Sequence, residues 1–115
     1  MIFDHNATHR QSLAALLRDH GIIVYEVENT TEALETAARV HPAAIVTDID
    51  SSLRQGLELI RKLRSASPGA RIVAMSNDDD LIYSAMSGSE GLRIVHKPIP
   101  YGAALNFARK FMSHA

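Results

Sequence analysis

The chain alternates short apolar runs with longer stretches in which apolar residues recur at helical spacing. The short runs are rich in β-branched residues, which favours strands over helices. Several are apolar throughout rather than alternating with polar residues, a pattern typical of strands buried on both faces. We therefore predict five strands, at residues Met1–Phe3, Ile22–Val27, Ala43–Thr47, Arg71–Met75 and Leu92–His96.

Amphipathic stretches between these runs predict helices. Thr8–His20 carries leucines at helical spacing and is followed by Gly21, a common helix stop. Asn29, with Glu32 three residues later, resembles a capping box that opens a helix ending near Val40. Further helices are predicted at Leu57–Leu63, after Asp78–Asp80 and at Tyr101–Met112.

Regular alternation of strands and helices indicates an α/β fold with a parallel sheet covered on both faces. Because the crossover connections are right-handed, the sheet is expected to be doubly wound. The order 2-1-3-4-5 of flavodoxin-like folds is one of the two common strand orders of such sheets. The length of 115 residues suits one such unit, so we expect a single domain over residues 1–115.

Composition narrows the possible functions without naming one. The chain has no cysteine, which excludes disulfides, cysteine-ligated zinc and a thiol nucleophile. The formal net charge of -1 argues against binding of polyanions by bulk charge, so we expect no nucleic-acid partner. No apolar run approaches the ~18 residues of a membrane span. We therefore expect no membrane association and a cytoplasmic location.

Charge is distributed unevenly along the chain. From Leu92 to the end there are four basic residues and no acid, namely Arg93, Lys97, Arg109 and Lys110. The simplest interpretation is that two faces of the domain differ in charge. A surface for a partner is the alternative.

The residues that follow the strands carry the strongest chemical signal, because ligands of doubly wound sheets bind beyond the carboxyl ends of the strands. The polar residues expected there are Asp4, His5, Asp48, Asp50, Ser76 and Lys97. Clustered carboxylates stay ionised beside a cation, and Mg²⁺ prefers oxygen ligands and a phosphoryl partner. A lysine and a hydroxyl can hold phosphoryl oxygens, and an aspartate can act as the nucleophile.

In this order and on these elements, the residues resemble the receiver domain of two-component response regulators, over essentially the whole chain. The segments that carry the resemblance are Phe3-Asp4-His5-Asn6, Ile45-Val46-Thr47-Asp48, Gly56-Leu57-Glu58-Leu59, Met75-Ser76 and Lys97-Pro98. The resemblance implies the five-stranded, flavodoxin-like (βα)5 receiver fold with strand order 2-1-3-4-5. It also implies a signalling switch in a phosphorelay rather than an enzyme.

The resemblance assigns roles to the residues at the strand ends. Asp48 would accept a phosphoryl group from a sensor histidine kinase or a phosphotransfer protein, and Ser76 and Lys97 would hold that group. A Mg²⁺ cofactor is implied, with ligands drawn from Asp4, His5, Asp48 and Asp50.

The sequence departs from the family pattern at the metal site that the resemblance implies. His5 stands where the family has the second of two adjacent acids, and imidazole is a poorer ligand for Mg²⁺ than carboxylate. Ile94 stands where the family usually has an aromatic residue. These departures leave open an alternative function, that of a pseudo-receiver acting as a protein-interaction module without phosphorylation. His9, four residues after His5, is expected to be a surface histidine.

The last third of the chain resembles the face through which receivers dimerise or contact output partners. Apolar residues in this part exceed what one core stripe needs, and they include Ile82, Tyr83, Met86, Phe107 and Phe111. We expect a homodimer contact or an output partner on this face.

Overall fold

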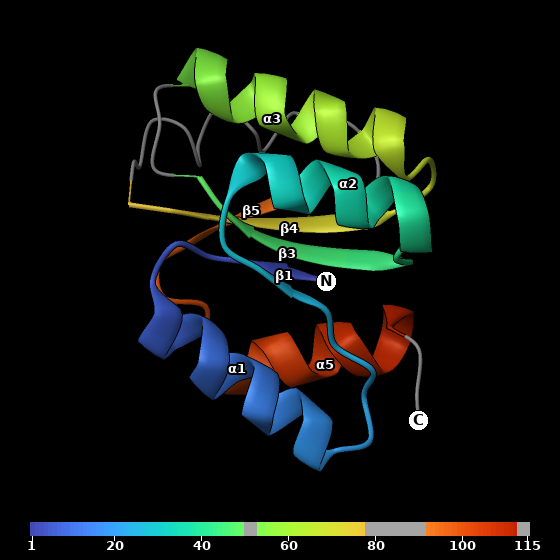
Figure 1. The fold of residues 1–115 in the computed structure, drawn as a ribbon. Helices are drawn as coiled ribbons and strands as arrows, with labels where there is room; N and C mark the ends of the chain where they lie inside the picture. The colour runs from blue at the N-terminus through green and yellow to red at the C-terminus, as the bar shows by residue number, and fades with distance from the viewer. Residues whose placement is uncertain (50–52, 78–91, 113–115) are drawn as a thin grey trace.

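A five-stranded parallel sheet forms the centre of the fold (Figure 1). The computed structural model describes residues 1–49, 53–77 and 92–112. The sheet order is β2-β1-β3-β4-β5 and every neighbouring pair is parallel, which confirms the predicted fold class and strand order. The strands are β1 (Ile2–Phe3), β2 (Glu26–Val27), β3 (Ala44–Asp48), β4 (Arg71–Ser76) and β5 (Leu92–His96).

Helices cover both faces of this sheet (Figure 1). One face carries α1 (Ala7–Asp19) and α5 (Tyr101–Phe111), and the other carries α2 (Thr30–Val40) and α3 (Leu53–Ala66). No helix in the described ranges is long and apolar enough to cross a membrane. The helix predicted after Asp78–Asp80, and the predicted partner-face residues Ile82, Tyr83 and Met86, lie outside the described residues.

The buried strands divide the core into two layers. Val46 and Val73 face α1 and α5, where they pack with Leu13 and Leu17. Their neighbours in sequence face α2 and α3, where the core includes Ile45, Ile72, Ala37, Ile60 and Leu63. All five residues of β3 are buried. The unbroken apolar run in the sequence is therefore explained by a strand that is covered on both faces.

Two elements differ in length from their predictions by more than one residue. The strand predicted at Ile22–Val27 pairs only at Glu26–Val27, because β1 has just two residues with which to form a ladder. Upstream of this strand the Val24 carbonyl accepts a side-chain hydrogen bond from Arg18 at 2.9 Å instead. Helix α3 extends beyond the predicted Leu57–Leu63 at both ends.

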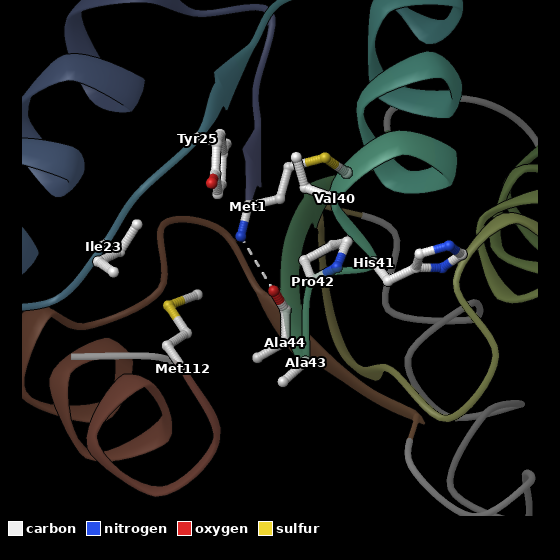
Figure 2. Close-up of a pocket in the computed structure, with 9 residues that line it drawn as sticks. All are labelled: Met1, Ile23, Tyr25, Val40, His41, Pro42, Ala43, Ala44 and Met112. Carbon is white, nitrogen blue, oxygen red and sulfur yellow. Dashed lines mark hydrogen bonds between the residues drawn. The ribbon is translucent and has the colours of Figure 1, made fainter. Parts of the chain in front are cut away.

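The amino end of the sheet holds a small pocket around Met1 (Figure 2). The Met1 amino nitrogen donates to the carbonyl oxygen of Ala44 at 3.0 Å. The pocket has a volume of about 170 Å³, and Ile23, Tyr25 and Met112 are among its lining residues. Burial lowers the pKa of the Met1 amine from its ordinary value of 8.0 to about 5, because the ammonium form loses its hydration.

This burial predicts a pH-dependent stability for a chain whose first residue is Met1. Between about pH 5 and pH 8 the unfolded amine binds a proton that the native amine does not. The free energy of unfolding therefore rises with pH across this interval, by roughly 4 kcal/mol at most. Urea unfolding at both ends of the interval measures the rise. Protein with an acetylated amino terminus is the control, and equal pH profiles for the two forms would contradict the prediction.

Candidate functional site

The carboxyl ends of four strands bring the predicted polar residues to one edge of the sheet. Asp4 follows β1, Asp48 ends β3, Ser76 ends β4, and Lys97 follows β5. Asp4, Asp48 and Ser76 are all buried. Asp48 pairs in register with Met75 across the β3–β4 ladder, so the end of β3 lies beside the end of β4.

Asp48 and Lys97 form an ion pair at this edge. The Asp48 side chain is 3% exposed and the Lys97 side chain 19% exposed, so water screens their attraction only weakly. A carboxylate removed from water requires a compensating cation. The ammonium group of Lys97, just beyond the carboxyl end of β5, is that cation. The peptide bond between Lys97 and Pro98 is cis.

Main-chain hydrogen bonds hold the strand-end residues in register. The amide of Lys97 donates to the carbonyl oxygen of Ser76 at 2.9 Å. The amide of Ile49 donates to the carbonyl oxygen of Met75 at 2.9 Å, which continues the β3–β4 ladder just beyond Asp48. The sheet itself therefore sets the relative positions of Asp48, Ser76 and Lys97.

Asp4 is fixed by residues of the loop and helix that follow it. Its Oδ1 accepts a hydrogen bond from the Asn6 amide at 2.8 Å, and its Oδ2 contacts Nδ1 of His9. Its backbone carbonyl accepts from Nη1 of Arg10 at 2.9 Å. His9 is thus a partner of Asp4 rather than the free surface histidine expected from the sequence.

His5 lies at the open side of the site. Its side chain is 63% exposed, and its Nδ1 lies 3.7 Å from Oδ2 of Asp48, which is close enough for an ion pair when the ring is protonated. The ring also lies against Phe3, with ring centroids 5.1 Å apart. His5 therefore presents a nitrogen to Asp48 at the position where the family pattern has a carboxylate.

The described residues do not complete a Mg²⁺ site. Within residues 1–49, 53–77 and 92–112, no three His, Asp or Glu side chains are placed to hold a metal ion together. Asp4 is engaged by Asn6 and His9, and Asp48 by Lys97. The remaining predicted ligand, Asp50, lies outside the described residues. Because Mg²⁺ requires closely placed oxygen ligands, this donor set fits the ion poorly.

Most of the chain matches a known family. A family model described as "Response regulator receiver domain" matches residues 1–105 of the chain. The chain belongs to the response regulator receiver domain family. A response regulator receiver protein from Anaeromyxobacter sp. (strain Fw109-5) is 36% identical to this receiver over 102 residues. That match covers 86% of this chain and 42% of the relative, so the chain spans less than half the length of the relative.

Solved structures of response regulators share the fold of this receiver. One is a response regulator from Burkholderia pseudomallei with a phosphorylated aspartic acid, a calcium ion and citrate. It has a TM-score of 0.75 at 25% identity, and the match covers 93% of this chain and 64% of that chain. One from Burkholderia multivorans has a TM-score of 0.70 at 26% identity, with 95% of this chain and 90% of that chain covered. One from Thermotoga maritima, at 24% identity, is similar in fold, with a TM-score of 0.77 over 96% of this chain and 92% of that chain.

Sequence reasoning missed two residues that organise the Asp4 loop, His9 and Arg10. Besides its bond to the Asp4 carbonyl, Arg10 forms ion pairs with Glu26 at 3.5 Å and Glu28 at 3.8 Å. The available signal was Asn6, which caps α1 by accepting from the His9 amide at 3.0 Å. With the helix starting there, His9 and Arg10 lie in its first turn, within reach of Asp4.

Restoring the missing acid should strengthen binding of Mg²⁺. The substitution His5→Asp adds a carboxylate beside Asp48, and we expect the affinity for Mg²⁺ to rise about tenfold or more. Isothermal titration calorimetry of both proteins measures the change. His20→Asp, which adds the same charge at the exposed end of α1, is the control. If His5→Asp binds Mg²⁺ no better than the His20→Asp control, His5 does not limit the metal site.

Removing Arg10 should destabilise the domain. Arg10→Met keeps an aliphatic stem but leaves the Asp4 carbonyl without its donor, and we expect the free energy of unfolding to fall by about 1–3 kcal/mol. Chemical denaturation measures the loss, with Arg39→Met on the exposed surface of α2 as the control. A variant of Arg10 that is as stable as the control would show that this network contributes little.

Proposed function

We propose that this receiver accepts a phosphoryl group on Asp48 from a phosphohistidine of a sensor histidine kinase or a phosphotransfer protein. The observation that carries the proposal is the buried Asp48 carboxylate at the end of β3, paired with Lys97. Membership of the receiver family supports it as well. So does the phosphorylated aspartic acid of the Burkholderia pseudomallei response regulator.

The proposed reaction transfers a phosphoryl group from nitrogen to a carboxylate oxygen. An oxygen of Asp48 attacks phosphorus, an O–P bond forms and the N–P bond breaks. The imidazole of the donor leaves with the bonding electron pair and takes up a proton. Lys97 stabilises the negative charge on the phosphoryl oxygens throughout, because its ammonium group is already in place at the acceptor.

After transfer, Ser76 and Lys97 become the partners of the new group. The Ser76 hydroxyl donates to a phosphoryl oxygen, and Lys97 exchanges its carboxylate partner for the phosphoryl oxygens. Because the Lys97 amide donates a hydrogen bond to the Ser76 carbonyl oxygen, movement of one residue displaces the other. Phosphorylation of Asp48 thereby changes the positions of residues at the carboxyl ends of β4 and β5.

We propose Mg²⁺ as the cofactor of this reaction, bound weakly because His5 offers no oxygen ligand. The calcium ion in the Burkholderia pseudomallei structure supports a divalent cation at this class of protein. The same histidine favours the second candidate function, an interaction module that signals without phosphate. A direct phosphorylation assay separates the two functions.

The assay incubates the protein with acetyl phosphate and Mg²⁺ and follows the intact mass. We expect a gain of one phosphoryl group in the wild type and a complete loss of that gain in Asp48→Asn, which keeps the size of the side chain. Asp19→Asn, an exposed acid at the end of α1, is the matched control and should be phosphorylated normally.

Two results would contradict the proposal. No mass gain with Mg²⁺, Mn²⁺ or Ca²⁺ would favour the interaction module. A gain that persists in Asp48→Asn would place the acceptor on another residue.

A further inference from the structure

A basic groove lies beside α5 where β4 and β5 begin. Its volume is about 210 Å³, and we define it by Arg71, Arg93, Phe107 and Phe111, which line it together with residues of the two strands. Arg71 pairs with the start of β3 at the Ala44 end, whereas Asp48 ends the same strand. The groove is therefore at the edge of the sheet opposite the phosphoryl site.

Strand register places both arginines on the same face of the sheet. Arg71 and Val73 are two residues apart on β4, and Val73 pairs with Arg93 on β5. Side chains alternate along strands, so these three share one face. Val73 packs in the core layer that contains α5, which identifies this face as the one covered by α5.

Aromatic side chains of α5 complete the groove. The rings of Phe107 and Phe111 pack together, with centroids 5.4 Å apart. The Arg71 guanidinium lies 5.1 Å from the centroid of the Phe111 ring, a cation–π contact. The groove thus combines apolar surface with positive charge.

The positive charge of the groove is not neutralised by the described part of the chain. Neither Arg71 nor Arg93 forms an ion pair with a described carboxylate, although both are exposed. The sequence has no acid from Leu92 onward. The basic residues in the last turn of α5, Arg109 and Lys110, suit the negative end of the helix dipole, whereas the two strand arginines have no such role.

We propose that the basic groove binds an acidic peptide segment of a partner protein, with one bulky apolar side chain of the segment seated against Phe107 and Phe111. Charge complementarity selects the acidic flanks of the segment, which pair with Arg71 and Arg93. The volume suffices for the apolar side chain, since a cavity of about 150 Å³ holds a benzene ring. This interaction goes beyond phosphorylation of Asp48 and does not require it.

The test measures binding of a fluorescent synthetic peptide in which glutamates alternate with leucines. Fluorescence anisotropy should show saturable binding to the wild type, weakening as salt rises. The double variant Arg71→Gln with Arg93→Gln should bind about fivefold or more weakly, since two exposed ion pairs are lost. The matched control removes two exposed charges on the opposite helices, through Arg39→Gln with Lys62→Gln, and should bind as the wild type does.

The single variant Arg93→Gln is the control for misfolding of the double variant. It leaves the Arg71–Phe111 contact in place and should still weaken binding. Phosphorylation of all variants by acetyl phosphate should be unchanged, which separates this proposal from the function of Asp48. The proposal is overturned if the peptide does not bind the wild type, or if the groove variants bind it as well as the control. It is also overturned if sedimentation shows a dimer of this chain that the groove variants abolish.

Discussion

The buried ion pair between Asp48 and Lys97 is the constraint on which the strand-end site depends. Strand β3 is buried along its whole length, so the carboxylate at its end leaves water only beside a cation. That cation comes from the end of β5, and β4 lies between the two strands. The pair therefore forms only when three strands are in register, and the same parallel ladders that build the core also position the proposed acceptor and its lysine.

The loop after β1 and the first turn of α1 provide the partners of a second buried acid, Asp4. Asp4 is held by the Asn6 amide and by His9, while Arg10 binds its backbone carbonyl and reaches the acids of the β2 edge. These contacts give the buried Asp4 protein partners on its carboxyl group and on its backbone carbonyl. His5 stands beside them at the position where the family pattern has a second acid.

The sheet was predictable from the sequence, whereas several partners of its polar residues were not. Strands β3 and β4 contain the unbroken apolar runs Ala44–Val46 and Ile72–Met75 in their sequences, and such runs separated by amphipathic stretches leave few topologies. The length of β2 depended instead on β1, a neighbour of only two residues. The contact of His9 with Asp4 depended on where Asn6 starts a helix, which a pattern of apolar residues does not specify. The roles of Asp48, Ser76 and Lys97 came from resemblance, and they stay predictions.

The most direct test of the account locates the phosphoryl group chemically. Borohydride reduces an aspartyl phosphate to homoserine, a change that survives digestion and can be assigned to one residue by tandem mass spectrometry. After treatment with acetyl phosphate and borohydride, we expect homoserine at position 48 alone. Homoserine at another aspartate, or at none in protein that remains folded, would contradict it.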